Sequence, residues 1–189
     1  HVLASLYDAE GNKVGKTEHT FHRGNGDNPD ELWVSRDLLA LEKDHQGAGF
    51  AQEWIAHTEK WYKESGVSHV RLEANIDVGG YAWARQGYDF ADKATAEKIR
   101  DRVSGILDAL TFELDFASPG TPAHDRALAR AAGAQELLDR FNNNEYGSAG
   151  YPTPFDVANA GRQPGQGRTE QWFGKLALLN SKWDGVKWL

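Results

Sequence analysis

The sequence predicts an α/β fold with a mixed, mostly antiparallel central sheet, a β-α-β core and a helical insertion before the C-terminal strand. Short stretches of alternating apolar residues fill the first 41 positions, an amphipathic segment lies between two predicted strands, and helical stripes dominate after residue 91. With 189 residues and 40% hydrophobic content, the chain is long enough to bury a core. We expect a single domain over residues 1–189, with residues 91–180 as a helical and loop-rich insertion.

The N-terminal residues predict a β-hairpin followed by a third strand. Val2–Tyr7 and Lys13–Arg23 flank residues 8–12, whose Gly and Asn suit the tight connection of a hairpin. Residues 24–30 are too polar to bury a face and predict a loop. Leu32–Leu41 then predicts a strand. Because side chains alternate along a strand, we expect one face to carry Ser35, Asp37, Leu39 and Leu41.

A helix and a further strand are predicted next. Apolar residues recur at three-to-four spacing over residues 46–65, and Gly66 is expected to end this helix. Val67–Ala74 alternates in part and predicts a strand, so the helix would connect two parallel neighbours. Residues 81–86 predict a short helix ended by Gly87, and residues 88–90 an extended piece.

The second half of the chain predicts mainly helices. One apolar stripe is formed by Ile99, Val103, Ile106, Leu107 and Leu110, and another by Ala127, Leu128, Ala131, Ala134, Leu138 and Phe141. Thr121 is expected to cap the second of these helices. The long stretch over residues 142–171 predicts a loop with one helical turn near residues 156–160. Residues 169–180 predict a helix, and residues 183–189 a last strand.

Composition excludes several classes of function. A net charge of -7 without a Lys/Arg block argues against nucleic-acid binding. The absence of Cys removes disulfides, thiolate catalysis and cysteine metal sites, and the His residues lack ligand spacing, so we expect no metal. No apolar run is long enough to span a membrane. Because the absence of Cys fits a reducing compartment, we expect a cytoplasmic protein.

The segment over residues 39–51 carries the clearest functional signal, because an apolar strand there leads through a glycine-bearing turn into a helix. The first N–H groups of a helix have no partner inside it and lie at the positive end of its dipole. Gly47 and Gly49 let a ligand approach backbone that has no Cβ. The segment therefore predicts a phosphate or pyrophosphate site.

The same turn resembles the signature of the Gcn5-related N-acetyltransferase (GNAT) superfamily, which is Gln or Arg, two residues, Gly, one residue, then Gly or Ala. The matching residues are Gln46-Gly47-Ala48-Gly49-Phe50-Ala51, and the family's aromatic-x-x-x-Gly-aromatic element is matched by residues 83–88. The resemblance covers roughly residues 32 to 90. It implies a central sheet of the GNAT type, in which residues 39–41 diverge from residues 70–72 to open a cleft.

The resemblance also implies a cofactor, acetyl-CoA or another acyl-CoA. In that family the turn binds the pyrophosphate, which assigns this role to the backbone of Gln46, Gly47, Ala48, Gly49, Phe50 and Ala51. The edge of the preceding strand pairs with the pantetheine arm, which assigns that role to Leu39, Ala40 and Leu41. The implied activity is transfer of the acetyl group, by direct attack, to an amine of a small molecule or a peptide.

Catalytic residues are less clearly indicated than the cofactor site. Trp83 stands where the family often has a Tyr that protonates the departing thiolate, so Tyr81 or water would have to serve. Asp37 is the first candidate to accept the amine proton, with Glu42 and Glu73 as alternatives. Two other functions stay open: a non-catalytic GNAT-like binding or structural module of a larger polypeptide, and an enzyme that binds another nucleotide at the same turn.

Overall fold

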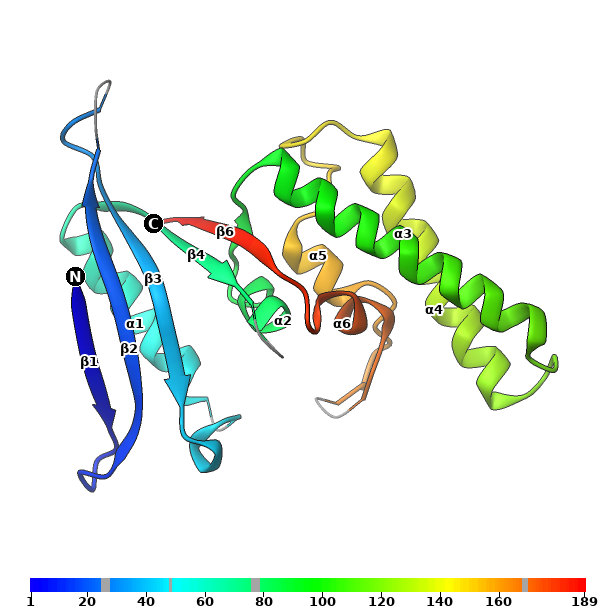
Figure 1. Ribbon diagram of the computed structural model, residues 1–189, viewed down its shortest axis with the longest axis horizontal. Coiled ribbons are helices and arrows are strands. Elements are labelled where there is room, and N and C mark those ends of the chain that lie inside the picture. Colours follow the sequence, from blue (N-terminus) through cyan, green and yellow to red (C-terminus); the bar gives the residue numbers. More distant parts are fainter. Residues whose placement is uncertain (25–27, 48, 76–78, 168–169) are drawn as a thin grey trace. The chain divides into compact units, whose positions relative to one another are not determined.

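The computed structural model has an α/β architecture and describes residues 1–24, 28–47, 49–75, 79–167 and 170–189 (Figure 1). The described elements are, in order, β1 (Val2–Tyr7), β2 (Lys13–Arg23), β3 (Leu32–Leu41), the 3₁₀ helix η1 (Lys43–His45), α1 (Phe50–Glu64), β4 (Val67–Ala74), α2 (Gly79–Ala84), β5 (Asp89–Phe90), α3 (Lys93–Phe116), α4 (Pro122–Asn143), α5 (Pro154–Asn159), α6 (Phe173–Leu178) and β6 (Trp183–Trp188).

The described strands form a six-stranded mixed sheet in the order β1-β2-β3-β4-β6-β5. The β1–β2 and β2–β3 pairs are antiparallel, and the β3–β4 pair is parallel. The chain divides into two compact units, one formed by residues 1–73 with 186–189 and the other by residues 74–185. The predicted insertion over residues 91–180 lies within the second unit.

In the first unit, helix α1 packs against one face of the sheet. Val34 of β3 and Val70 of β4 are paired and fully buried, and Ile55 and Tyr62 are the buried apolar residues of α1. The predicted hairpin between β1 and β2 is confirmed. The Asp8 carboxylate, which accepts the Asn12 N–H at 2.7 Å, helps to close its turn. The Leu189 N–H donates to the Ser68 carbonyl at 3.1 Å.

The second unit has its own helical core, in which α3 and α4 lie side by side (Figure 1). The predicted cap is confirmed, since the Thr121 hydroxyl accepts the His124 N–H at 3.3 Å at the start of α4. Asp92 caps α3 in the same way, through the Thr95 N–H at 2.7 Å. Both helices therefore begin where a side-chain acceptor replaces a missing backbone partner.

Several predicted helix boundaries were wrong. Helix α1 begins at Phe50 and not at residue 46, because Gly47 and Gly49 adopt left-handed backbone with φ of 80° and 96°. The short helix α2 begins two residues before the predicted start. The predicted helix over residues 169–180 is confined to α6, which ends at Leu178 before Asn180 takes a positive φ of 55°.

Candidate functional site

Within the ranges that the structure describes, strand β3 has no paired neighbour on its β4 side along its second half, and we call this stretch its open edge. Its ladder with β4 consists of pairs from Leu32↔Val67 to Ser35↔Arg71, although β3 continues to Leu41 and β4 to Ala74. On its other side, β3 stays paired with β2 as far as Leu41↔Gly15. The two parallel strands separate towards their C-terminal ends (Figure 1).

A β-bulge at Asp37 lies where this open edge begins. Leu38 pairs with Glu18 and Arg36 pairs with His19, so Asp37 is an extra residue without an opposite partner. One extra residue moves the side chain of each later residue in the strand to the opposite face of the sheet. The prediction that Leu39 and Leu41 share a face with Ser35 and Asp37 was therefore wrong: Leu39 and Leu41 lie opposite Thr17 and Gly15, on the face that α1 covers.

The backbone of Leu39 and Leu41 points to the open edge. Residues of an antiparallel strand alternately direct their N–H and C=O groups towards the paired neighbour and away from it. The Glu42 N–H donates to the Val14 carbonyl at 2.9 Å, so the backbone groups of Glu42 are directed to β2. By alternation, the backbone N–H and C=O groups of Ala40 and Leu38 are also directed to β2. Leu39 and Leu41 consequently point away from β2. The Leu41 carbonyl accepts the Gln46 side-chain amide at 2.9 Å.

The open edge leads into the predicted glycine turn. Leaving out the adjacent residues, a Cβ added at Gly47 or Gly49 would meet no described atom within 4 Å, so no described side chain crowds either position. Gly49 is the N-cap of α1 and supplies no side-chain acceptor, and the first helical hydrogen bond runs from the Glu53 N–H to the Gly49 carbonyl at 3.1 Å. The N–H groups of the first helical turn, which includes Phe50 and Ala51, thus have no acceptor inside the helix. Ala48 lies outside the described residues.

The two predicted catalytic residues belong to different compact units. Asp37 is exposed, and its carboxylate accepts the Thr20 hydroxyl at 2.6 Å. Tyr81 lies on α2 in the second unit, where its hydroxyl accepts a long hydrogen bond of 3.4 Å from Arg85. Of the alternatives, Glu42 and Glu73 are both exposed in the first unit. The structure therefore places Asp37, and not Tyr81, in the unit that contains the open edge.

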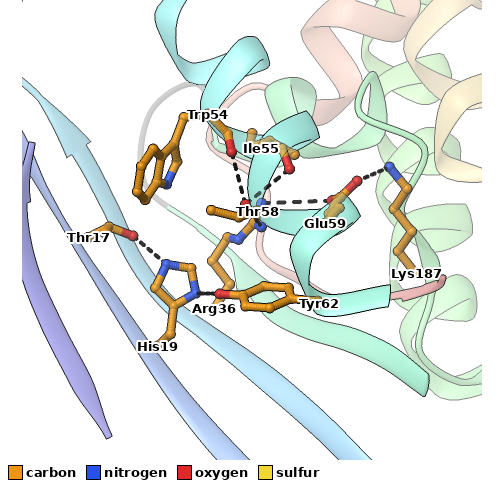
Figure 2. Close-up of polar contacts among 9 residues, drawn as sticks. All are labelled: Thr17, His19, Arg36, Trp54, Ile55, Thr58, Glu59, Tyr62 and Lys187. Atoms are coloured by element: carbon orange, nitrogen blue, oxygen red, sulfur yellow. Dashed lines mark hydrogen bonds and ion pairs between the residues drawn. The ribbon is translucent and has the colours of Figure 1, made fainter. Parts of the chain in front are cut away.

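Sequence reasoning missed a buried chain of hydrogen bonds between the sheet and α1 (Figure 2). The Thr17 hydroxyl donates to the Leu38 carbonyl at 3.0 Å, and its oxygen lies 2.6 Å from His19 Nε2. His19 Nδ1 lies 2.7 Å from the Tyr62 hydroxyl. Thr17, His19 and Tyr62 are all buried. The only trace in the sequence is their spacing, because Thr17 and His19 share the inward face of β2.

Charged side chains lie beside this chain (Figure 2). Arg36 is buried; its Nη2 donates to the Thr58 hydroxyl at 3.0 Å and its Nη1 lies 3.9 Å from Glu59 Oε1. The second oxygen of Glu59 accepts Lys187 Nζ at 2.6 Å. One carboxylate of α1 thus joins a cation of β3 to a cation of β6.

Burial and charge both keep His19 neutral. Desolvation, together with the nearby Arg36 guanidinium, lowers the pKa of His19 from 6.5 to about 4. Burial raises the pKa of Tyr62, so its hydroxyl keeps its proton. The Thr17 hydroxyl donates its hydrogen bond to the Leu38 carbonyl, so its oxygen can only accept from His19. Neutral His19 therefore carries its proton at Nε2 and accepts at Nδ1 from the Tyr62 hydroxyl.

This neutral His19 predicts an acid-sensitive fold. Between pH 6.5 and about 4 the unfolded chain binds a proton that the folded chain does not, so acidification favours unfolding. From pH 7 to pH 5, the free energy of unfolding is expected to fall by about 2 kcal/mol through His19. Urea unfolding of the wild type and of His19→Gln at both pH values measures it, since the variant lacks this contribution. Equal pH dependence in the two proteins would contradict the assignment.

The second unit contains a pocket of about 250 Å³ between α4 and α5, lined by Gly133, Glu136, Leu137, Arg140, Phe155, Asp156, Asn159, Ala160 and Gly161. Asp156 is held there by the Thr153 hydroxyl at 2.9 Å and by Arg140 at 3.2 Å. These contacts stabilise the start of α5. The pocket includes none of the residues that the sequence singled out, so the open edge and the glycine turn remain the candidate site.

Among the residues that the structure describes, no group of His, Asp and Glu is placed to hold a metal ion. Within the same ranges, no helix combines the length and the apolar character needed to cross a membrane.

No protein-family model matches the chain, and a search of curated proteins gives no match. A solved structure described as "Crystal structure of bacterial toxin" is similar with 17% sequence identity and a TM-score of 0.37. The matched region covers 47% of this chain and 57% of that chain. A similarity of this size carries no argument about what the chain does.

Proposed function

We propose that the chain is an acyl-CoA-dependent N-acyltransferase with a fold of the GNAT type. The observation that carries the proposal is the open edge of β3, which begins after Ser35 and leads into the left-handed glycines at the start of α1. An extended strand edge followed by a helix N-terminus fits a ligand that has an amide-bearing arm and a pyrophosphate. Acyl-CoA is such a ligand.

The binding roles follow from the backbone. The pyrophosphate lies against Gly47, Gly49 and the first N–H groups of α1, where the helix dipole favours an anion. The pantetheine arm pairs with the outward C=O group of Leu39 and the N–H of Leu41, as an added strand would. The thioester then lies at the Leu39 end, because the pyrophosphate occupies the other end of the edge.

The chemistry is a direct transfer. The neutral amine attacks the thioester carbonyl, a C–N bond forms, the C–S bond breaks, and the electron pair leaves on the CoA sulfur. The outward N–H of Leu39 is placed to donate to the oxyanion that forms at the carbonyl. Asp37, exposed at the bulge beside this end, accepts the proton that the amine loses. Water protonates the thiolate.

Calorimetry with acetyl-CoA, CoA and longer acyl-CoAs tests this function. We expect saturable binding of at least one of these ligands, which ATP and NAD do not displace at equal concentration. If none of the CoA compounds binds, the proposal is wrong. Displacement by ATP or NAD would instead favour an enzyme that uses another nucleotide. Binding without acetyl transfer to any amine in a panel of small amines and peptides would favour the non-catalytic module.

A further inference from the structure

We propose that the buried chain Tyr62–His19–Thr17 positions the Leu39 N–H as the donor to the acyl carbonyl, which makes these three residues positioning residues for acyl transfer. The inference rests on the proposed function. It adds a role for side chains that lie between the sheet and α1, away from the open edge itself.

The hydrogen bonds of this chain have a fixed direction. A carbonyl cannot donate, so the Thr17 hydroxyl gives its proton to the Leu38 carbonyl, 3.0 Å away. The Thr17 oxygen then accepts from His19 Nε2 at 2.6 Å, and a neutral imidazole with its proton at Nε2 accepts at Nδ1 from the Tyr62 hydroxyl at 2.7 Å. In each hydrogen bond the donor therefore lies on the α1 side and the acceptor on the β3 side.

The last bond of the chain acts on Leu39 through a single peptide group. The Leu38 carbonyl and the Leu39 N–H belong to the same planar unit and point in opposite directions. Thr17 holds the carbonyl on the β2 side, so the N–H is held towards the open edge. Hydrogen bonds in such a chain also polarise one another, which strengthens the outward N–H as a donor.

The bulge explains why this peptide needs additional support. Asp37 interrupts the regular ladder with β2 immediately before Leu38, and the ladder with β4 has already ended at Ser35. Among the described strands, only β2 is therefore paired with the peptide that follows, which lies next to an irregularity. A side chain from β2 that holds this carbonyl restores a fixed orientation where the thioester is expected.

The preference for acetyl-CoA over CoA tests the inference without knowledge of the acceptor amine. Only acetyl-CoA has the carbonyl that Leu39 contacts, whereas both ligands share the pantetheine arm and the pyrophosphate. In Thr17→Val, which keeps the shape of the side chain without the hydroxyl, we expect acetyl-CoA to bind about 5- to 10-fold more weakly and CoA to bind as in the wild type. Thr17→Ser, which keeps the hydroxyl, should restore the preference.

Two further measurements separate positioning from general loosening of the fold. The ¹³C resonance of the bound acetyl carbonyl should move upfield in Thr17→Val and return in Thr17→Ser. Tyr62→Phe should shift it in the same direction by less, because His19 stays in place. Equal weakening of CoA and acetyl-CoA in Thr17→Val, or an unchanged preference, would overturn the inference while leaving the proposed function intact. Failure of the wild type to bind either ligand would overturn both.

Discussion

The Gly49→Glu protein is expected to bind acetyl-CoA about 100-fold more weakly than the Gly49→Gln protein, which corresponds to about 3 kcal/mol. Gly49 is the N-cap of α1, and no described side chain crowds it. A carboxylate there would stand next to the proposed pyrophosphate site and repel the ligand. The partial positive charge of the helix N-terminus would interact with the Glu carboxylate in place of the ligand.

The Gln variant is the matched control for Gly49→Glu. Glu and Gln have the same size and suffer the same strain at a φ of 96°, so their difference isolates the charge. Calorimetry at low and at high salt gives a second check, because screening should raise the affinity of the Glu variant more than that of the Gln variant. Equal affinities of the two folded variants would show that no anionic group of the ligand lies beside Gly49.

Local sequence pattern was sufficient for most of the fold. The predicted strands Val2–Tyr7, Lys13–Arg23, Leu32–Leu41 and Val67–Ala74 agree with the structure residue for residue. Each is bounded by a turn signal that acts within a few residues, as in the Asp8–Asn12 hairpin. Helix α4 was predictable for the same reason, since Thr121 and Pro122 mark its start.

Features that depend on pairing between strands were not predictable from one strand alone. The bulge at Asp37 exists only relative to β2, and nothing in residues 32–41 marks the extra residue. The error about Leu39 and Leu41 followed directly, since alternation was assumed to continue through Asp37. The start of α1 was misplaced because a glycine at positive φ and a glycine inside a helix look alike in sequence.

The backbone part of the candidate site was predictable, whereas its supporting side chains were not. Residues 39–51 were singled out by an apolar strand and two glycines, and the structure adds the open edge and the left-handed turn. His19 and Arg36 gave no such signal, because polar residues on a strand are usually exposed. Their burial depends on the face that α1 covers, which is a tertiary property.

The Glu59→Gln protein is expected to lose about 3 kcal/mol of unfolding free energy, because the change removes the carboxylate between Arg36 and Lys187. An amide keeps the shape and part of the hydrogen bonding but no charge. Arg36 is 3% exposed and would remain charged in the core without this carboxylate. Urea unfolding at pH 7 measures the loss. Glu64→Gln is the control, since Glu64 lies on the same helix with an exposed partner, Lys60, and should change stability by less than about 0.5 kcal/mol.

A double variant shows whether the loss comes from the remaining charge. If Arg36 is the cause, Arg36→Met combined with Glu59→Gln should be more stable than the sum of the two single changes predicts, because no cation of β3 is then left buried. Strict additivity would mean that Glu59 acts through Lys187 instead, 2.6 Å away at the C-terminal strand. Arg36 immediately precedes the bulge at Asp37. A coupling between Arg36 and Glu59 would therefore mean that α1 is stabilised by a contact with β3 at the residue where the open edge begins.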